Sequence, residues 1–425
     1  MREKGDNMAL TKKPVNGMKD ILPREMRIRD YLIAQIKETY RSFGFTPIET
    51  PVVENIANLT SKQGGDNEKL IFKIMKRGEK LKLESATCEE DIADSGLRYD
   101  LTVPLVRFYS NNENDLPKPF KALQIGPVFR ADRPQRGRFR EFYQCDIDII
   151  GDGSNLAETE LILATSTLLG KIGFEDFTVV INDRQILKAM ASYCGIAEAD
   201  YDKTFIILDK MDKIGMEGVS KELSEIGYGK ETSDKYIELF SLINDSENPL
   251  EALTEKLAGI IKPEVISNLE AIISNVNSGK TAKFNLKFDP TLVRGMSYYT
   301  GPIFEIKIGD FGSSCGGGGR YDSMVEKFIG RAVPACGFSI GFERIITILL
   351  ENGFEAPGAN KQIAFLIEKN MPADRMSEIM KEAAKLREEG FEVSLNIMAK
   401  NKKFQKEQLE QNGITDIKEF FVNPI

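Results

Sequence analysis

The sequence predicts an α+β protein, and three stretches of its 425 residues carry that prediction. Residues 121–130 have the composition of a strand, and residues 137–151 alternate with a period of two, so the two segments should form an antiparallel hairpin around a charged loop. Residues 200–280 repeat apolar positions at helical spacing and indicate an inserted helical module. Beyond residue 361, short strands alternate with helices, which is typical of a small α/β domain.

The remaining elements follow in chain order from the same patterns. Apolar residues on one face predict a helix over residues 24–43, which Gly44 would end. Two prolines interrupt the β-rich segment 45–54, as is typical of an edge or interface strand. Strands that lead into helices are predicted over 97–110, 177–194 and 335–353, strands over 281–308, and a glycine-rich strand over 313–325. After a linker at 354–361, strands at 363–367, 391–397 and 417–422 alternate with helices at 373–389 and 399–412.

The amino-acid composition limits the chemistry that this chain can perform. It contains no histidine, so an imidazole side chain cannot serve as a general base, as the partner of a nucleophile or as a metal ligand. Catalysis must therefore use carboxylates, arginines, bound metal ions and the substrate itself. The net charge of −8 is that of an ordinary protein rather than of one that coats nucleic acid, although a local basic patch can still bind RNA.

Three features predict a cytoplasmic protein that does not enter a membrane. No apolar run reaches the length needed to span a bilayer. The N-terminal residues 1–14 are polar and lack the apolar segment of a signal peptide. The 5 cysteines are scattered without a CxxC pair, which indicates reduced thiols rather than a disulfide framework or a zinc site.

One face of the second hairpin strand has an unusual order of polar side chains. That face carries, in order, Arg138, Arg140, Phe142, Gln144, Asp146 and Asp148. Arginines at the mouth of a hairpin suit a polyphosphate or an RNA backbone, because a planar guanidinium forms paired hydrogen bonds. The aromatic ring farther in could stack on a purine, and the amide and acids beyond it could hold a cationic small molecule. The alternative is a solvated strand face with cross-strand ion pairs, but the ordered gradient favours a binding site.

Three further segments combine glycine with polar or aromatic residues. Residues 292–301, LVRGMSYYTG, place an arginine before two tyrosines, and a tyrosine-rich strand near a turn is an equally good interpretation. Residues 316–322, GGGGRYD, allow a ligand to approach the backbone closely but match no phosphate-binding loop, and a packing bulge is the alternative. Residues 337–345, GFSIGFERI, put an arginine near a helix start, where it opposes the helix dipole; a surface salt bridge is the usual alternative to a functional role.

In this order along the chain, the segments resemble the histidyl-tRNA synthetases, a family of class II aminoacyl-tRNA synthetases. The likeness begins at GMKDILP (17–23), takes residues 24–54 as the first motif, and continues through RYDLTVP to GPVFRADRPQRGRFREFYQCDIDIIG as the second motif. RGMSYYTG and GGRYD resemble the histidine-specific signatures, and GFSIGFERI resembles the third motif. The resemblance implies a class II catalytic domain built on a mostly antiparallel β-sheet flanked by helices, with a helical insertion and a small C-terminal α/β domain.

The same resemblance divides the chain into domains. Residues 1–195 and 281–353 would form the class II catalytic domain, and residues 196–280 would form the helical insertion. A linker at 354–361 would lead to an anticodon-binding-like domain at 362–425, which looks shorter than the complete domain of the family. The first motif builds the dimer interface in this family, so a homodimer is expected.

The implied activity is the ATP-dependent ligation of L-histidine to tRNA(His) through a histidyl-adenylate intermediate. The histidine carboxylate attacks the α-phosphorus and expels pyrophosphate, so no protein base is needed, and arginines and Mg²⁺ neutralise the charge. The expected partners are ATP, L-histidine and tRNA(His), with neither DNA nor a membrane among them. The alternative is a catalytically silent, histidine-binding regulatory subunit of ATP phosphoribosyltransferase, which shares the fold and which the short C-terminus would also fit.

The resemblance also assigns residues to the site. Arg130, Arg294 and Arg344 would be catalytic. ATP would contact Arg130, Asp132, Arg138, Phe142 and Arg344. Histidine would contact Asp100, Thr102, Gln144, Asp148, Arg294, Tyr298, Tyr299 and Tyr321. Where the family form reads R-G-L-D-Y-Y, this chain has Ser297 in place of the acid, which is expected to weaken local positioning.

Overall fold

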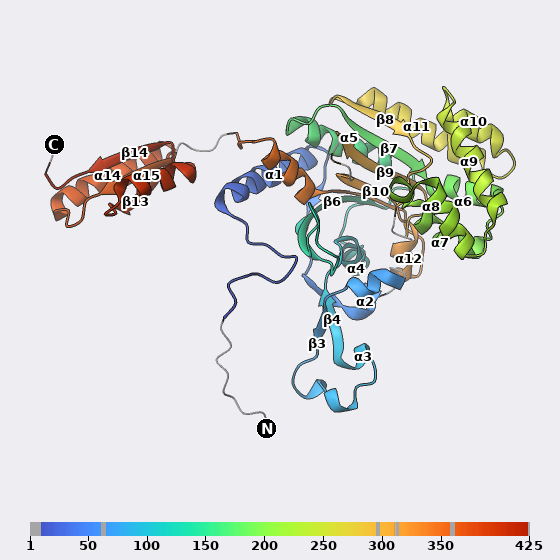
Figure 1. Cartoon of the computed structure of the whole chain (residues 1–425), viewed down its shortest axis with the longest axis horizontal. Coiled ribbons are helices and arrows are strands. Elements are labelled where there is room, and N and C mark those ends of the chain that lie inside the picture. The colour runs from blue at the N-terminus through green and yellow to red at the C-terminus, as the bar shows by residue number, and fades with distance from the viewer. Residues whose placement is uncertain are drawn as a thin grey trace. The chain divides into compact units, whose positions relative to one another are not determined.

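The computed structural model describes residues 10–60, 65–294, 298–309, 311, 314–357 and 362–423. The chain forms two compact units, one of Met1–Lys19 with Ala34–Ile348 and one of Asp20–Ile33 with Leu349–Ile425. Figure 1 traces the elements of both units. Among the helices of the described ranges, none combines the length and the apolar character needed to cross a bilayer. The predicted domain limits stay a prediction.

A single large sheet organises the first unit (Figure 1). Within the described ranges it contains eight strands in the order β1-β5-β6-β11-β10-β9-β7-β8. The strands are β1 (Thr46–Pro47), β5 (Phe120–Phe129), β6 (Glu141–Ile150), β7 (Phe177–Asp183), β8 (Phe284–Phe288), β9 (Pro302–Ile308), β10 (Gly316–Arg320) and β11 (Ala335–Ile340). The described pairs are antiparallel except for β1–β5 and β7–β8 at the two edges. The predicted α+β fold with a mostly antiparallel sheet is therefore confirmed.

The predicted hairpin is present in the large sheet as strands β5 and β6, which lie between β1 and β11. They pair antiparallel from Phe120 opposite Ile150 to Phe129 opposite Glu141. The prediction of a strand from residue 137 is wrong at its start, because β6 begins at Glu141. The connection instead closes on itself through two backbone hydrogen bonds between Gln135 and Arg138, at 3.1 and 2.9 Å. A charged turn, rather than a longer strand, therefore presents the arginines.

Helices pack against strands of the large sheet, among them β6 and β11. Helix α5 buries most of its length, including Leu161 and Leu168, and packs against α11 and the strands β6 and β11. Helix α4 packs against α12. The helices of this unit outside the insertion are α2 (Ile56–Thr60), α3 (Glu89–Ile92), α4 (Thr102–Asn112), α5 (Leu156–Lys171), α6 (Arg184–Tyr193) and α12 (Ser323–Ile329). Two helices run across both units, α1 (Pro23–Ser42) and α13 (Phe342–Glu351).

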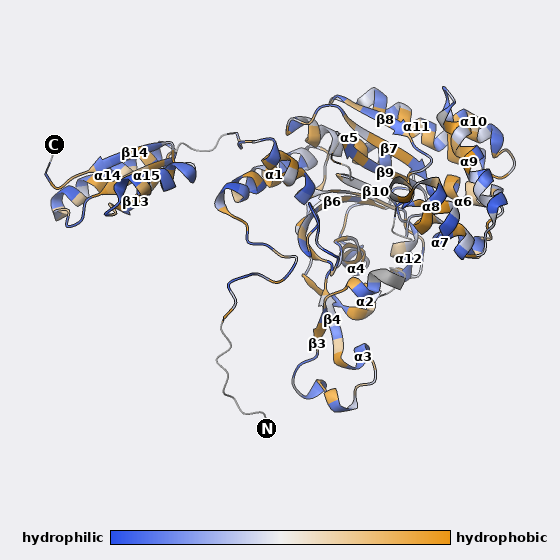
Figure 2. Cartoon of the chain, viewed as in Figure 1, coloured by the Kyte–Doolittle hydropathy of each residue, from blue (hydrophilic) through white to orange (hydrophobic). Residues whose placement is uncertain are grey.

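The region predicted as an inserted helical module is helical. It contains α7 (Tyr201–Leu208), α8 (Met211–Glu225), α9 (Lys230–Asn244), α10 (Pro249–Lys256) and α11 (Pro263–Gly279). Polar and apolar residues alternate along each of these helices in Figure 2, as expected for amphipathic helices. Helices α7 to α10 pack against one another in chain order, with Val219, Leu239 and Leu253 fully buried, whereas α11 packs against α5 and β7.

A small second sheet in the first unit was not predicted from the sequence. Its strands, in the order β2-β4-β3, are β2 (Val53–Asn55), β4 (Ala93–Leu97) and β3 (Lys73–Met75), and both pairs are antiparallel. Short 3₁₀ turns at Gly65–Leu70, Gly78–Lys80, Leu83–Ser85 and, far along the chain, Glu198–Asp200 complete the unit. These strands are three to five residues long, too short for a period-two pattern to reveal.

The C-terminal part of the second unit is a small α/β fold, as predicted. Its elements are β12 (Gln362–Ile367), α14 (Ala373–Glu388), β13 (Glu392–Ile397), α15 (Lys402–Gln411) and β14 (Asp416–Phe420). The strands form a parallel sheet in the order β13-β12-β14. Phe365 and Ile367 of β12 pack against Ile379 and Ala383 of α14 to form its core. That this domain is shortened stays a prediction.

Candidate active site

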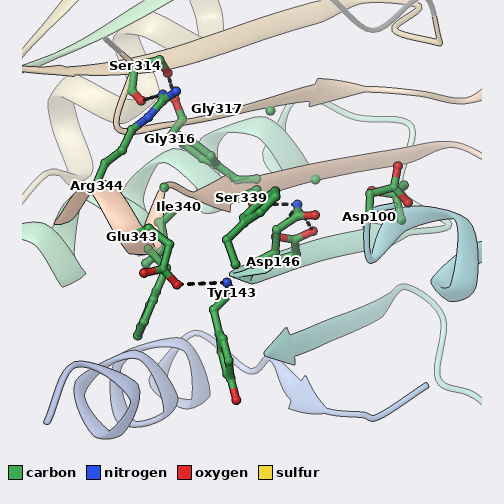
Figure 3. Close-up of a pocket in the computed structure, with 18 of the residues that line it drawn as sticks. Asp100, Tyr143, Asp146, Ser314, Gly316, Gly317, Ser339, Ile340, Glu343 and Arg344 are labelled. Atoms are coloured by element: carbon green, nitrogen blue, oxygen red, sulfur yellow. Dashed lines mark hydrogen bonds between the residues drawn. The ribbon is translucent and has the colours of Figure 1, made fainter. Parts of the chain in front are cut away.

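A cavity of about 340 Å³ opens over β6, β10 and β11 (Figure 3). Its lining includes every residue that the resemblance assigned to the site, namely Asp100, Thr102, Arg130, Asp132, Arg138, Phe142, Gln144, Asp148, Arg294, Tyr298, Tyr299, Tyr321 and Arg344. The volume lies in the range of small-molecule sites. The structure thus brings these residues together from segments more than 200 positions apart, while the role of each stays a prediction.

The floor of the cavity is the polar face of β6. Gln144, Asp146 and Asp148 follow one another at alternate positions, and each is at least nine-tenths buried. On the neighbouring strand β11, Gly337 lies opposite Asp148. A Cβ atom on Gly337 would stand 2.0 Å from Asp148 Oδ1, so glycine there makes room for the carboxylate. The period-two pattern therefore predicted the floor correctly from Phe142 inward.

Asp148 and the tyrosines form one end of the cavity. The Tyr321 hydroxyl donates to Asp148 Oδ1 at 2.6 Å. The other oxygen, Oδ2, is buried and has no hydrogen-bond partner among the described residues. Burial raises the pKa of Asp148 to about 7, against the effect of the Tyr321 hydrogen bond and with a further contribution from Asp100. Tyr298 meets the Tyr321 ring edge-on, with ring centroids 6.1 Å apart. This end can hold a flat ring that offers an N–H.

Arg294 brings a cation to the wall of the same cavity. Its Nη1 donates to Glu305 Oε2 at 2.9 Å, while its Nε is buried without a hydrogen-bond partner among the described residues. A Cβ atom on Gly317 would stand 2.5 Å from Arg294 Nη1, so the guanidinium lies directly against the backbone of β10. An arginine with an unused donor in a pocket suits a carboxylate or a phosphate.

The other end of the cavity is cationic. Arg130 places its guanidinium 4.4 Å from the centre of the Tyr99 ring and 5.1 Å from that of Phe142, and its Nε donates to the Tyr99 carbonyl at 3.1 Å. Arg138 is held by Asp132, with Nη2 2.8 Å from Oδ2. Cations and an aromatic face together suit a nucleotide, with its phosphates on the guanidinium groups.

Arg344 closes this cationic end from α13 (Figure 3). Its Nη1 donates to the Ser314 carbonyl. Burial lowers the pKa of Arg344, because desolvation disfavours the charged form. An anion in the cavity would offset that desolvation. Arg344 lines the cavity, and the role predicted for it stays a prediction.

Asp100 and Thr102 reach the cavity from the start of α4. Asp100 Oδ1 accepts a hydrogen bond from the Val103 backbone N–H at 3.0 Å, which fixes the carboxylate at the helix end. Asp100 is 2% exposed and Thr102 is 8% exposed. Both therefore face the interior of the site rather than solvent.

Arg140 departs from the predicted polar face. Its backbone N–H donates to the Gly17 carbonyl at 2.8 Å, and its side chain donates to the carbonyls of Asp132 and Asn16, at 3.1 and 3.2 Å. The prediction of a continuous face from Arg138 to Asp148 is wrong for this residue, because a contact with a distant segment turns its side chain away. Ser297, the predicted departure from the family pattern, lies outside the described residues.

Several lining residues were not among those that the resemblance assigned to the site. Asp146, Ser339 and Glu343 line the cavity, and Glu343 Oε1 accepts the Tyr143 backbone N–H at 3.2 Å (Figure 3). Burial, with a further contribution from Asp148, raises the pKa of Asp146 well above its ordinary value. The signal for Asp146 was present, because it alternates with Gln144 and Asp148 on one strand face. Ser339 and Glu343 lie within the GFSIGFERI segment, in which the resemblance assigned only Arg344 to the site.

Arg320, within the GGGGRYD segment, lies outside this lining and has a different environment. Its Nε and Nη2 donate to the two oxygens of Glu158, at 2.6 and 2.8 Å. Its Nη1 donates to the Asp152 carbonyl at 3.1 Å, and Nη2 also to the Ser154 carbonyl at 2.9 Å. This paired ion clasp joins β10 to α5.

Comparison with known proteins identifies the family. The family model described as histidyl-tRNA synthetase matches residues 17–345. This chain belongs to the histidyl-tRNA synthetase family. A histidine–tRNA ligase of Leifsonia xyli subsp. xyli is 42% identical over 407 residues, which cover 92% of this chain and 91% of the relative.

Solved structures agree with membership of the histidyl-tRNA synthetase family. A histidyl-tRNA synthetase from Nostoc sp. PCC 7120 is 29% identical with a TM-score of 0.75, covering 96% of this chain and 90% of that chain. A Bacillus halodurans structure, titled as an ATP phosphoribosyltransferase regulatory subunit/histidyl-tRNA synthetase, is 23% identical with a TM-score of 0.73, covering 97% of this chain and 98% of that one. At that identity the likeness shows the fold alone. The class II fold predicted from the sequence is confirmed.

Proposed function

We propose that this chain ligates L-histidine to tRNA(His) in an ATP-dependent reaction that passes through histidyl-adenylate. One observation carries the proposal from the structure. Three buried polar atoms in the cavity, Gln144 Oε1, Asp148 Oδ2 and Arg294 Nε, have no hydrogen-bond partner among the described residues. Buried polar groups are normally paired, so two acceptors and a donor call for a ligand that offers N–H groups and an anionic oxygen. Histidine offers both.

The amino acid would lie between the tyrosines and the floor of β6. Asp148 would accept the imidazole N–H, since its Oδ1 is already occupied by Tyr321 and its Oδ2 faces no partner. Asp100, Thr102, Tyr298 and Tyr299 would complete this end of the site. Arg294 would take the histidine carboxylate. A site whose buried acceptors need an N–H rejects an amino acid that lacks one, because the acceptors then stay unpaired.

ATP would lie at the cationic end. Arg130, Arg138 and Arg344 would neutralise the phosphates, Asp132 would hold Arg138 in place, and Phe142 would stack on adenine. The histidine carboxylate attacks the α-phosphorus in line, a P–O bond forms, and pyrophosphate leaves with the electron pair of the broken bond. The carboxylate is already nucleophilic, so the residues act by positioning and by neutralising charge, which a chain without histidine can do.

Mg²⁺ is proposed as an ion that ATP brings with it. Among the described residues, no group of three or more cysteine, aspartate or glutamate side chains could form a cage for a metal ion. That fits Mg²⁺ bound mainly by phosphates and water, with one or two carboxylates. Glu343, beside Arg344, would be the carboxylate at the phosphate end. The ion would supply further neutralisation of the phosphate charge.

The remaining partners are proposed from the family. In the second step the 3′-terminal ribose hydroxyl of tRNA(His) attacks the adenylate carbonyl, its proton passes to the adenylate phosphate or the substrate amine, and the bond to the phosphate breaks so that AMP leaves. Residues 1–195 with 281–353 would form the catalytic domain, 196–280 the insertion, and 362–425, after the linker 354–361, the domain that meets the anticodon. We also propose a homodimer and a cytoplasmic location, which sedimentation and fractionation would test.

The experiment is pyrophosphate exchange with each amino acid in turn, followed by charging of total tRNA with labelled histidine. The expected result is exchange driven by histidine together with histidine-dependent charging of tRNA. Histidine binding without either activity would overturn the proposal and favour the regulatory subunit of ATP phosphoribosyltransferase. Exchange driven by another amino acid would overturn the assignment of the substrate.

A further inference from the structure

We propose that Asp146 and Ser339 are positioning residues that fix the side-chain amide of Gln144, so that its carbonyl oxygen faces the cavity as an acceptor for an N–H of the amino acid. The inference rests on the proposed function, because it assigns to the amino-acid side of the same site two residues that sequence comparison with the family motif did not assign.

The first observation is that the amide nitrogen of Gln144 is held by hydrogen bonds. Gln144 Nε2 donates to Asp146 Oδ2 at 3.2 Å, with Oδ1 at 3.4 Å, and to Ser339 Oγ at 3.2 Å (Figure 3). Ser339 lies directly opposite Asp146 on β11 and also hydrogen-bonds to its carboxylate. The hydrogen bond from Ser339 favours the ionised form of Asp146, against the effect of burial. With Asp146 ionised, a reversed amide would turn its carbonyl oxygen toward the carboxylate, and two acceptors would meet without a proton between them. The pair therefore holds the amide in one of its two orientations.

The position of the carbonyl oxygen carries the second step. With Nε2 held on the floor, Gln144 Oε1 is buried and has no hydrogen-bond partner among the described residues. Gln144 itself lines the cavity beside Asp148. A buried acceptor that is held in place and left unpaired selects a ligand with a donor at that point. The orientation of the amide thus decides whether the site presents an acceptor or a donor to the amino acid.

Gln124, on the other side of β6, does not compete with Gln144 for the Asp146 carboxylate. Gln124 of β5 lies opposite Asp146 in the sheet. Its Nε2 donates to the Leu101 carbonyl at 3.1 Å, and its Oε1 accepts from the Thr50 hydroxyl at 3.3 Å. Both ends of the Gln124 amide are therefore occupied away from Asp146. The Asp146 carboxylate is left to serve Gln144 and Ser339.

The test measures KM for histidine and KM for ATP in pyrophosphate exchange, using the full chain. Asp146→Asn keeps the shape but lets the neighbouring amides adopt either orientation, and we expect KM for histidine to rise about tenfold, the loss of one hydrogen bond to a charged group. KM for ATP should stay within about twofold. Gln144→Glu alone should also raise KM for histidine, because it sets two carboxylates against each other.

The decisive variant combines Asp146→Asn with Gln144→Glu. The carboxylate at position 144 then has acceptors in both orientations, and the amide at position 146 donates to it. We expect KM for histidine to return to within about threefold of wild type, although each single change is harmful. A merely structural role would make the double variant at least as poor as either single one, and that result would overturn the inference.

Asp183→Asn is the matched control, because Asp183 is 2% exposed, lies outside the lining and accepts the Gln185 N–H at the start of α6. It should leave KM for histidine unchanged. If Asp146→Asn is insoluble alone, Ser339→Ala replaces it and should raise KM for histidine about threefold, because one of two acceptors is lost. Wild-type KM values in either variant overturn the inference. A wild-type chain without histidine-dependent exchange would instead refute the proposed function.

Discussion

Two buried polar regions, the clasp between Arg320 and Glu158 and the floor of the cavity, differ in how many of their polar atoms have hydrogen-bond partners. In the clasp, three guanidinium nitrogens of Arg320 meet four acceptors at 2.6 to 3.1 Å. In the cavity, Gln144 Oε1, Asp148 Oδ2 and Arg294 Nε have no partner among the described residues. Both groups lie in the unit built on the large sheet, so burial alone does not separate them.

This difference teaches how to tell a structural polar cluster from a functional one. A fully paired network stabilises the fold, because each buried group has replaced its water with a protein partner. An incompletely paired network leaves desolvation uncompensated until a ligand arrives. The number of unused donors and acceptors, rather than the number of charges, therefore marks the site. Variants of the clasp should therefore lower stability, and variants of the cavity should lower activity.

The largest expected effect is on stability, at the clasp. Arg320→Met would leave the Glu158 carboxylate, which is fully buried, without its cation. We expect the free energy of unfolding to fall by about 3–5 kcal/mol, as when one partner of a buried ion pair is removed. Urea denaturation would measure it. Arg320→Met combined with Glu158→Met should recover most of the lost free energy of unfolding. If Arg320→Met alone is as stable as wild type, the clasp does not stabilise the fold and the comparison is wrong.

The next effect is on activity, at Arg294. Arg294→Met should lower kcat/KM for histidine-dependent exchange about 100- to 1000-fold, because a donor aimed at developing charge is lost. Its stability should change far less than that of Arg320→Met, since its Glu305 partner keeps some exposure to solvent, 17% of the side chain. Arg294→Lys, which keeps the charge without the planar fork, should be intermediate. Loss of stability with activity preserved would contradict the comparison.

The smallest effect is the change that Tyr321→Phe makes in the pH dependence of the stability of the free chain. Asp148 ionises near pH 3.8 when unfolded and near pH 7 when folded, so between these values the folded state holds an extra proton. Stability from this group is full below about pH 3.8 and is lost as pH rises through about 7. Tyr321→Phe removes the hydrogen bond that opposes this shift, and it should extend the decline upward by less than about one pH unit.

Thermal midpoints from pH 4 to pH 8 would measure this effect, as the difference between wild type and each variant. Asp148→Asn removes the titrating group, so its curve should be flatter than that of wild type. Asp183, whose pKa burial also raises to about 7, adds a slope of the same sign that both proteins share. Parallel curves for wild type and Asp148→Asn would show that the pKa of Asp148 is not raised in the folded chain.

The sequence predicted elements well where one pattern ran for many residues. The strand at 177–183 follows from its run of β-prone residues, and the hairpin paired from Phe120 to Ile150 follows from the composition of its first strand and the alternation in its second. Site residues were predicted through motifs, and the cavity gathers them. Prediction failed where a contact with a distant segment of the chain sets the direction of a side chain. Arg140 belongs to the polar face by periodicity, but the Gly17 and Asn16 carbonyls hold it elsewhere.

Other failures have the same physical origin. The strands β2, β3 and β4 are stabilised by pairing with one another rather than by their own pattern, so three to five residues gave no signal. Arg320 was read with the glycines that precede it, yet its partner Glu158 lies 162 positions away. The role inferred for Asp146 depends on Ser339, a cross-strand neighbour that only the register of β6 and β11 reveals.

The glycines of β10 and β11 also constrain how this pocket can evolve. Much of that wall is bare backbone, and any side chain added at Gly317 or Gly337 would collide with Arg294 or Asp148. Point mutations there cannot reshape the cavity gradually, because the first added carbon already displaces Arg294 or Asp148, which we propose as histidine-binding residues. Adaptation to histidine analogues must start from β6 and the tyrosines. A directed-evolution library should therefore randomise those positions and keep the glycine codons fixed.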